Sequence, residues 1–274
     1  MGDHLYVVAD DEHHLAVFAA DDHRLAGTLV RVRRGALPSA KEARKRRKPD
    51  FESLVTLRPF GTYPYGALFA IGSGSKPNRR SAVLLALTAH GSAHGAPRTV
   101  SLQNWFTRLR REFGEVNLEG AFVQGENLTL LQRGNKGSPR NACVRIALAP
   151  LLDAMAKRRS VPSPRLASVA DFDLGVFDGT PLCFTDGAAL PGGGFVFTAV
   201  AEATEDSYAD GACVGAAIGI IDADDRLRAL WQLVPTLKIE GIEARVTGKG
   251  LELTVVTDAD RASVAAQLLT VTLR

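Results

Sequence analysis

A short motif recurs along this 274-residue chain at intervals of about 60 residues. In each occurrence an apolar strand runs into a small or charged polar cluster. The five occurrences are LYVVAD at 5–10, ALFAIGSGS at 67–75, LTLLQRGN at 128–135, FVFTAVAEAT at 195–204 and LELTVVTD at 251–258. Recurrence at this spacing is typical of repeat architectures, and it constrains the fold more strongly than composition does.

Further short strands that end at Gly, Asp, Asn or Pro surround each occurrence. Repeated units of this kind predict an all-β fold, a five-bladed β-propeller of four-stranded antiparallel blades, in a single domain over residues 1–274. The expected blades cover approximately 5–34, 51–107, 117–176, 181–235 and 238–274. A six-bladed propeller or a β-sandwich is the rival architecture, but a sandwich gives no reason for an acid to recur at one point of each unit.

The first unit offers only three strands, because its innermost strand is missing from the sequence. The ring would close by exchange of a terminal strand, or residues before Met1 would supply the missing one. Helix signals are sparse, and only Trp105–Phe113 and Leu151–Arg159 predict helices.

Composition excludes several classes of protein. No uncharged apolar stretch reaches the length of a membrane span, and 46% hydrophobic residues exclude a disordered chain. Residues 1–10 contain no apolar signal segment. We therefore expect a cytoplasmic location, or a periplasmic one if the natural N-terminus is truncated.

Four acids lie in the apolar strand that precedes the recurring motif. They are Glu52, Glu119, Asp186 and Glu240. If this strand lines the channel of a propeller, the four carboxylates converge and repel one another. A cation between them would relieve the repulsion, and an all-oxygen ligand set favours Ca²⁺ or Mg²⁺. Asp10 and Glu202, at the ends of the second strands, could add to this metal site.

Ion pairing is the alternative, in which each acid meets a Lys or Arg of a neighbouring unit. Lys48 and Lys238 lie shortly before Glu52 and Glu240 in the sequence and could supply that charge.

Polar residues at the ends of the second strands suit an anion beside a metal. Ser73, Ser75 and Asn135 are the expected ligand-binding residues, and Arg79, Arg80, Arg133 and Lys238 are expected to stabilise charge on a substrate. The spacing of a phosphate-binding P-loop is absent, and so is the nucleophile elbow of α/β-hydrolases.

Three segments carry a resemblance to known families: KPDFESL at 48–54, NLEGAFV at 117–123 and KIEGIEA at 238–244. They resemble the repeated D-L-E-G-L signature of propellers related to esterase-like phytases and to the SdiA-regulated family. KPDFESL is also similar to a segment of the calcium-dependent apyrases, which are five-bladed propellers with calcium on the axis. The whole pattern looks like that of an uncharacterised bacterial β-propeller family. The chain departs from the signature at Asp186, which stands where the Glu-Gly pair is expected.

Two function classes remain open. The first is a divalent-metal-dependent hydrolase of phosphoester-like anions, in which Glu52, Glu119, Asp186 and Glu240 hold the cation. The second is a non-catalytic propeller that binds a small ligand or a protein and holds at most a structural cation.

The expected partner is a small anionic ligand or substrate in the axial pocket. The basic segment 41–48 (KEARKRRK) raises the alternative of nucleic acid. No aromatic residues are interleaved with its charges for base stacking, so a solvated loop is the preferred interpretation. We expect no membrane partner.

Overall fold

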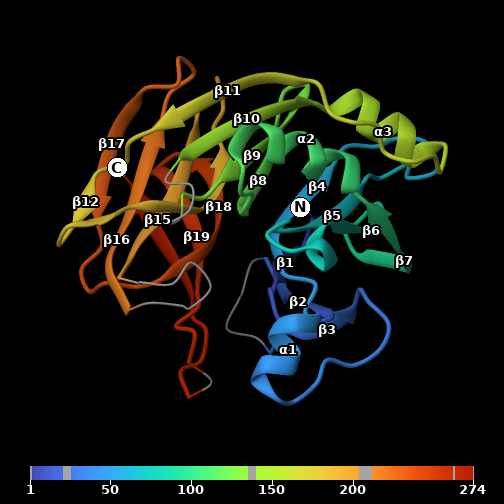
Figure 1. The fold of residues 1–274 in the computed structure, drawn as a ribbon, viewed down its shortest axis with the longest axis horizontal. Helices are drawn as coiled ribbons and strands as arrows, with labels where there is room; N and C mark the ends of the chain where they lie inside the picture. The colour runs from blue at the N-terminus through green and yellow to red at the C-terminus, as the bar shows by residue number, and fades with distance from the viewer. Residues whose placement is uncertain (1, 21–25, 135–139, 204–211, 262, 274) are drawn as a thin grey trace. The chain divides into compact units, whose positions relative to one another are not determined.

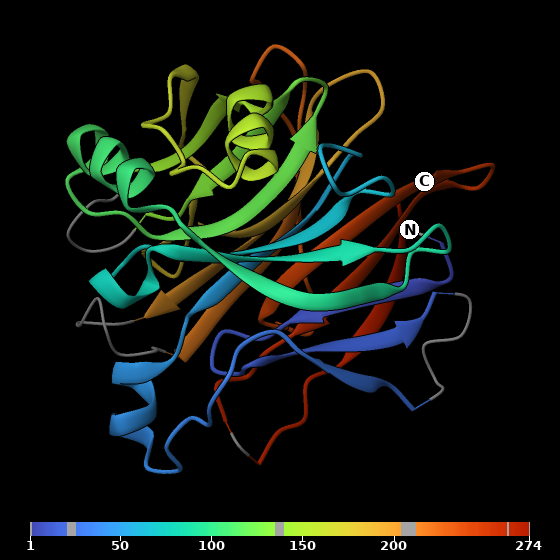
Figure 2. The same cartoon turned by 90° about the vertical axis from the view of Figure 1, so that its right-hand side faces the viewer.

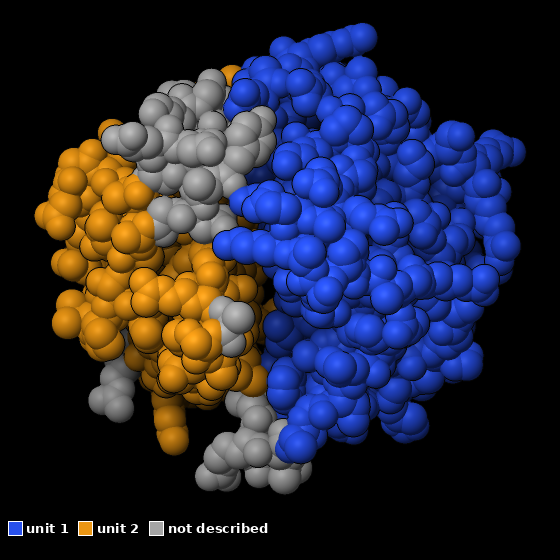
Figure 3. Space-filling view, turned by 60° about the horizontal axis from the view of Figure 1, so that its bottom comes forward, with its two compact units in different colours: residues 1–118, 125–128, 146–166 blue, residues 119–124, 129–145, 167–274 orange. Residues whose placement is uncertain are grey.

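The computed structural model describes residues 2–20, 26–134, 140–203, 212–261 and 263–273. The chain forms the expected all-β, five-bladed β-propeller, with five antiparallel sheets that follow one another in sequence (Figure 1). It divides into two compact units. Unit 1 contains Met1–Leu118, Gly125–Leu128 and Ile146–Leu166, and unit 2 contains Glu119–Gln124, Thr129–Arg145 and Ala167–Arg274 (Figure 3). A single domain over the whole chain stays a prediction.

Each sheet pairs its strands in sequence order. The first contains β1 (His4–Val8), β2 (His14–Ala19) and β3 (Thr28–Arg31), and the second β4 (Phe51–Leu57), β5 (Ala67–Gly72), β6 (Ser81–Leu87) and β7 (Ala93–Ser101). The third contains β8 (Leu118–Gln124), β9 (Asn127–Gln132), β10 (Asn141–Ala147) and β11 (Leu166–Phe172). The fourth contains β14 (Cys183–Ala189), β15 (Phe195–Ala203), β16 (Ala212–Ile221) and β17 (Leu227–Gln232). The fifth contains β18 (Ile239–Thr247), β19 (Gly250–Thr257) and β20 (Leu268–Leu273), and a small hairpin joins β12 (Val176–Phe177) to β13 (Thr180–Pro181).

The first and last sheets have three strands each, so three of the five have the expected four. The short first sheet agrees with the sequence prediction. The C-terminal strand β20 pairs with β19 inside the fifth sheet. In the described part of the chain, the strand exchange considered for ring closure is therefore not found.

The burial pattern along the strands shows which residues form the apolar core of each unit. β4 alternates buried and half-buried residues, as expected for a sheet with two unlike faces, whereas β5 is buried throughout. In unit 1, Phe51 lies in an apolar cluster that draws on the first and second sheets. In unit 2, Phe184, Phe195 and Phe197 form edge-on and tilted contacts at ring distances of 5.1 to 6.4 Å.

Three α-helices accompany the sheets in the described residues. α2 (Gln103–Phe113) confirms one prediction, and α3 (Leu148–Ala156) begins and ends three residues before the other. The segment expected as a loop is instead a short helix, α1 (Lys41–Arg47), which lies beside the first sheet (Figure 2). α1 has no buried residue, and Arg44 ties it to the turn after β1 through Asp11 at 2.9 Å. In the described residues, no helix is both long enough and apolar enough to cross a membrane.

A β-bulge occurs near the start of the first strand in the second, fourth and fifth sheets. The register skips Glu52 in β4, Thr185 in β14 and Glu240 in β18. A bulge leaves one residue without a cross-strand partner and turns its side chain away from the regular alternation. The bulge therefore defines the structurally equivalent position in these sheets.

Candidate functional site

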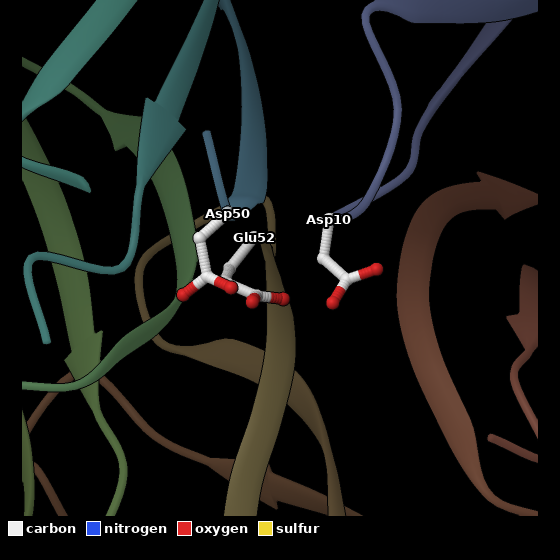
Figure 4. A group of neighbouring side chains, drawn as sticks. All are labelled: Asp10, Asp50 and Glu52. Carbon is white, nitrogen blue, oxygen red and sulfur yellow. The ribbon is translucent and has the colours of Figure 1, made fainter. Parts of the chain in front are cut away.

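Three carboxylates come together in unit 1. Asp10 follows β1, while Asp50 and Glu52 lie at the start of β4, and one oxygen of each lies within 4.8 Å of the others (Figure 4). The backbone holds Asp50 in place: its N–H donates to the carbonyl of Asp10 at 3.0 Å, and its own carbonyl accepts from the N–H of Ser73 at 2.9 Å. We call Asp10, Asp50 and Glu52 the carboxylate group of unit 1.

Two cations contact this carboxylate group. Lys48 Nζ contacts Asp10 and lies 2.9 Å from Asp50 Oδ1. Arg79 Nη1 lies 2.7 Å from Asp50 Oδ2. The Asp50 side chain is only 4% exposed, so both cations offset a carboxylate that is almost removed from water.

Two hydroxyls complete this arrangement. Ser73 donates to Asp50 and lies 2.8 Å from the hydroxyl of Ser75, which also accepts from Arg79 at 2.8 Å. Gly74 between them has a φ of 76°, and a Cβ there would lie 1.9 Å from the ring of Phe106. The GSGS segment therefore packs closely enough to require glycine at this position.

The structure thus gathers Ser73, Ser75 and Arg79, which the sequence proposed for an anion. Arg80 has a different electrostatic environment: burial and the positive charge of the nearby Arg110 both lower its pKa. Asn135, the third proposed ligand-binding residue, lies outside the described residues.

Burial and charge act in opposite directions on the ionisable residues here. Burial raises the pKa of Asp10, although Lys48 opposes the shift. Burial disfavours the ammonium of Lys48, but Asp50 and Asp10 outweigh it and raise the pKa of Lys48. Burial together with repulsion from Arg79 and Lys45 lowers the pKa of Lys76. Lys45 and Lys76 are therefore further cations near the carboxylate group, in addition to Lys48 and Arg79.

A second charged cluster lies in unit 2, and two cations organise it. Arg133 lies 3.5 Å from Glu119 and 2.5 Å from Glu202. Lys238 lies 2.8 Å from Glu202 and 3.1 Å from Glu240, and it also contacts Asp260. We call these six residues the charged cluster of unit 2.

The pKa shifts follow from this pairing. Burial disfavours the carboxylate of Glu202, but Arg133 and Lys238 outweigh it and lower its pKa. Burial raises the pKa of Glu240 to about 8, against the opposing effect of Lys238 and Arg133. The nearby carboxylates raise the pKa of both Lys238 and Arg133 despite the cost of burial.

Asp186 lies one residue beyond the position that corresponds to Glu52 and Glu240. The bulged residue of β14 is Thr185, so Thr185 corresponds to Glu52 and Glu240, and Asp186 is one residue further along. Thr185 donates to the carbonyl of Ile239 at 2.7 Å. Asp186 Oδ2 accepts from the N–H of Ile242 at 3.0 Å, and burial raises the pKa of Asp186 well above its usual range.

The four-acid ring stays a prediction: the bulge offsets Asp186 by one residue, and the other three acids are distributed over the two units. Glu52 belongs to unit 1, while Glu119 and Glu240 belong to unit 2 and contact Arg133 and Lys238. Ion pairing, the alternative interpretation of the sequence, describes the unit 2 acids, including Glu202. Only the carboxylate group of unit 1 has the convergent geometry of a cation site among the described residues.

The sequence interpretation missed Asp50 and Asp260. Asp50 stands two residues before Glu52 in the segment KPDFESL, and the same offset in the fifth sheet gives Lys238 before Glu240. Comparing the residues two positions before each bulge would have revealed an acid in one sheet and a base in another.

Carboxylate oxygens are ligands suited to Ca²⁺ or Mg²⁺, so the donor chemistry of Asp10, Asp50 and Glu52 fits either ion. Ion binding would require Lys48 to move, because its ammonium contacts Asp10 and Asp50.

Comparison with known proteins places the chain in a family without giving it a function. No curated protein matches the sequence. One family model matches residues 1–273, almost the entire chain, and its description is "Family of unknown function (DUF6929)". This agrees with the expected uncharacterised family, while the resemblance to phytase, SdiA-regulated and apyrase propellers and the bacterial origin stay predictions. The chain belongs to the family of unknown function DUF6929.

Proposed function

We propose that unit 1 carries a divalent-cation-dependent site for a phosphoester-like anion, with hydrolysis as its reaction. The observation that carries the proposal is the convergence of Asp10, Asp50 and Glu52 within 4.8 Å beside several cations. The carboxylates suit a hard cation, and the adjoining cations suit a phosphate group.

The residues divide into two sides. Asp10, Asp50 and Glu52 would hold the cation, whose chemical contribution would be to polarise the oxygens of the bound anion. Arg79 and Lys76 would contact the anion and offset the charge that develops on it. Ser75, which accepts from Arg79, orients the guanidinium.

Lys48 would compete with a bound cation for Asp10 and Asp50, so substitutions of Lys48 and of Asp50 should change cation affinity in opposite directions. Calorimetric titration with Ca²⁺ and with Mg²⁺ should show saturable binding. Asp50→Asn should weaken that binding at least about 10-fold, because it removes a charged ligand. Lys48→Met should tighten it, because it removes the competing ammonium.

Asp171→Asn is the matched control. Asp171 is an exposed carboxylate paired with Arg140 at 3.0 Å, outside the carboxylate group, so this variant should bind the cation as the wild type does. Absence of saturable binding in both the wild type and Lys48→Met would overturn the proposal.

Ligand binding without turnover is a second candidate function. The ion pairs of Lys48 favour it, because they neutralise Asp10 and Asp50 without a metal. A panel of nitrophenyl phosphomonoesters and diesters with Ca²⁺ or Mg²⁺ present separates the two candidates. Product release that Asp50→Asn abolishes supports hydrolysis, whereas saturable binding without product supports the second function.

A further inference from the structure

Unit 1 contains a cavity of about 210 Å³, and none of the three residues of the carboxylate group lines it. Its walls come from the turn before β2, the end of β3, the loop at 35–37 and helix α1. The side chains with polar or charged ends are Glu12, His13, His14, Arg31 and Arg44. The volume lies below the range of about 300–1,000 Å³ typical of drug-sized ligands, so a small occupant is favoured.

The two arginines of this cavity have different partners. Arg44 lies 2.9 Å from Asp11 and also contacts Glu12, so carboxylates match its charge. Arg31 donates to the carbonyls of Gly35 at 3.0 Å and Arg33 at 3.5 Å. In the described part of the chain no carboxylate pairs with Arg31, so its positive charge is oriented but not neutralised.

Both histidines are anchored through the same ring nitrogen. His13 Nδ1 lies 3.2 Å from the carbonyl of Gly35, and a carbonyl only accepts, so Nδ1 carries the hydrogen. His14 Nδ1 lies 3.5 Å from Glu12 Oε2, a weaker contact of the same polarity. This leaves Nε2 of each ring as the atom for a ligand.

We propose that this cavity binds a small oxyanion of the phosphate or sulfate type, either free or as the terminal group of a small molecule. Arg31 supplies a planar fork that matches the oxygens of such an anion. Glu12, which also lines the cavity, limits the net charge of the site. The function is distinct from the proposed cation site, because none of the three carboxylates of that site lines the cavity.

Sulfate is the appropriate probe, because its charge stays constant between pH 5.5 and 8 while phosphate changes its own. Titration of the full chain with sodium sulfate against sodium chloride of equal ionic strength should give saturable binding. The titration is carried out at pH 5.5. Arg31→Gln should weaken this binding at least about 10-fold.

Arg34→Gln is the matched control, because Arg34 is an exposed arginine close in sequence that does not line the cavity. It should leave sulfate affinity unchanged, as should Asp50→Asn in the cation site. Equal weakening by Arg31→Gln and Arg34→Gln would indicate general attraction to a basic surface and would overturn the proposal. So would the absence of saturable binding at pH 5.5. Phosphate and a phosphomonoester, titrated at pH 5.5, then separate a free anion from a terminal group.

Discussion

The carboxylate group of unit 1 and the charged cluster of unit 2 use a lysine in the same way but differ in what surrounds it. Lys48 bridges Asp10 and Asp50, as Lys238 bridges Glu202 and Glu240. Beyond Lys48 lie further cations, whose repulsion together with burial lowers the pKa of Lys76. The ammonium of Lys238, by contrast, contacts three carboxylates, those of Glu202, Glu240 and Asp260.

From this difference we expect the unit 1 group to exchange Lys48 for another cation and the unit 2 cluster to retain Lys238. In unit 1, Arg79 stays on Asp50 if Lys48 leaves, and the three carboxylates are close enough to share another ion. In unit 2, Arg133 also contacts Glu202, but Lys238 is the cation common to three carboxylates, which come from different strands or their ends. We therefore expect the unit 2 cluster to support the fold and the unit 1 group to bind ligands.

Lys238→Met tests this expectation most severely. The substitution leaves Glu202, Glu240 and Asp260 without their common cation, and breaking a buried ion pair on one side costs about 3–5 kcal/mol. Urea unfolding should show this loss in the free energy of unfolding, and Ca²⁺ should not restore it. A loss below about 1 kcal/mol would contradict the structural role of Lys238.

The pH dependence of stability gives the next largest effect. Burial raises the pKa of Glu240 to about 8 from an ordinary value of 4.5. The folded state therefore holds this proton more tightly than the unfolded state does. Its contribution to stability is fully present below pH 4.5, declines as the pH rises towards 8, and is lost above that pH. Allowing for partial exposure of the carboxylate, we expect a decline of about 2 kcal/mol.

Glu240→Gln isolates that decline, because the amide resembles the protonated acid. The variant should match the wild type near pH 4.5 and exceed its stability at pH 9 by about the same 2 kcal/mol. Unfolding curves collected across this pH range provide the measurement. If the unfolding free energies of the wild type and of Glu240→Gln change with pH in the same way, the expected effect of Glu240 is contradicted.

Lys48→Met should have a smaller cost than Lys238→Met and a different response to metal. Arg79 still contacts Asp50, and Asp10 is 32% exposed, so water compensates part of the loss. We expect about 1–2 kcal/mol of destabilisation without metal, and Ca²⁺ should restore it by binding the folded state. Thermal melting of both lysine variants with and without Ca²⁺ makes the comparison. If Ca²⁺ restored the stability of both lysine variants equally, or of neither, the two clusters would not differ in the way we expect.

Much of the fold was predictable because its signals are local. The alternation of β4 and the glycines and acids that end the strands are visible in the sequence. Helix α1 was missed because it has no apolar stripe. All its residues are exposed or half-buried, and the Arg44 contacts that hold it come from a distant turn.

The site was less predictable, because equivalence between sheets depends on bulges. The recurring acid predicted from the sequence falls in the first strand of three sheets, as Glu52 in β4, Glu119 in β8 and Glu240 in β18. The extra residue of the bulge in β14 placed Thr185 at the position assigned to Asp186, and nothing in the letters FTDG shows which residue is extruded. The cations that pair with these acids were foreseen as an alternative, but their exact partners depend on three-dimensional proximity.

Asp186→Asn tests that correction and should have the smallest effect. Burial favours the protonated form of Asp186, whose Oδ2 accepts from the N–H of Ile242. An asparagine oxygen can accept the same hydrogen bond, and neither an amide nor a protonated acid carries charge. We expect a change of less than about 1 kcal/mol in unfolding free energy at pH 7 and no change in Ca²⁺ affinity. Loss of Ca²⁺ binding in this variant, with Asp50→Asn unaffected, would return the cation to the acid ring first expected from the sequence and would make unit 2 the ligand-binding part of the chain.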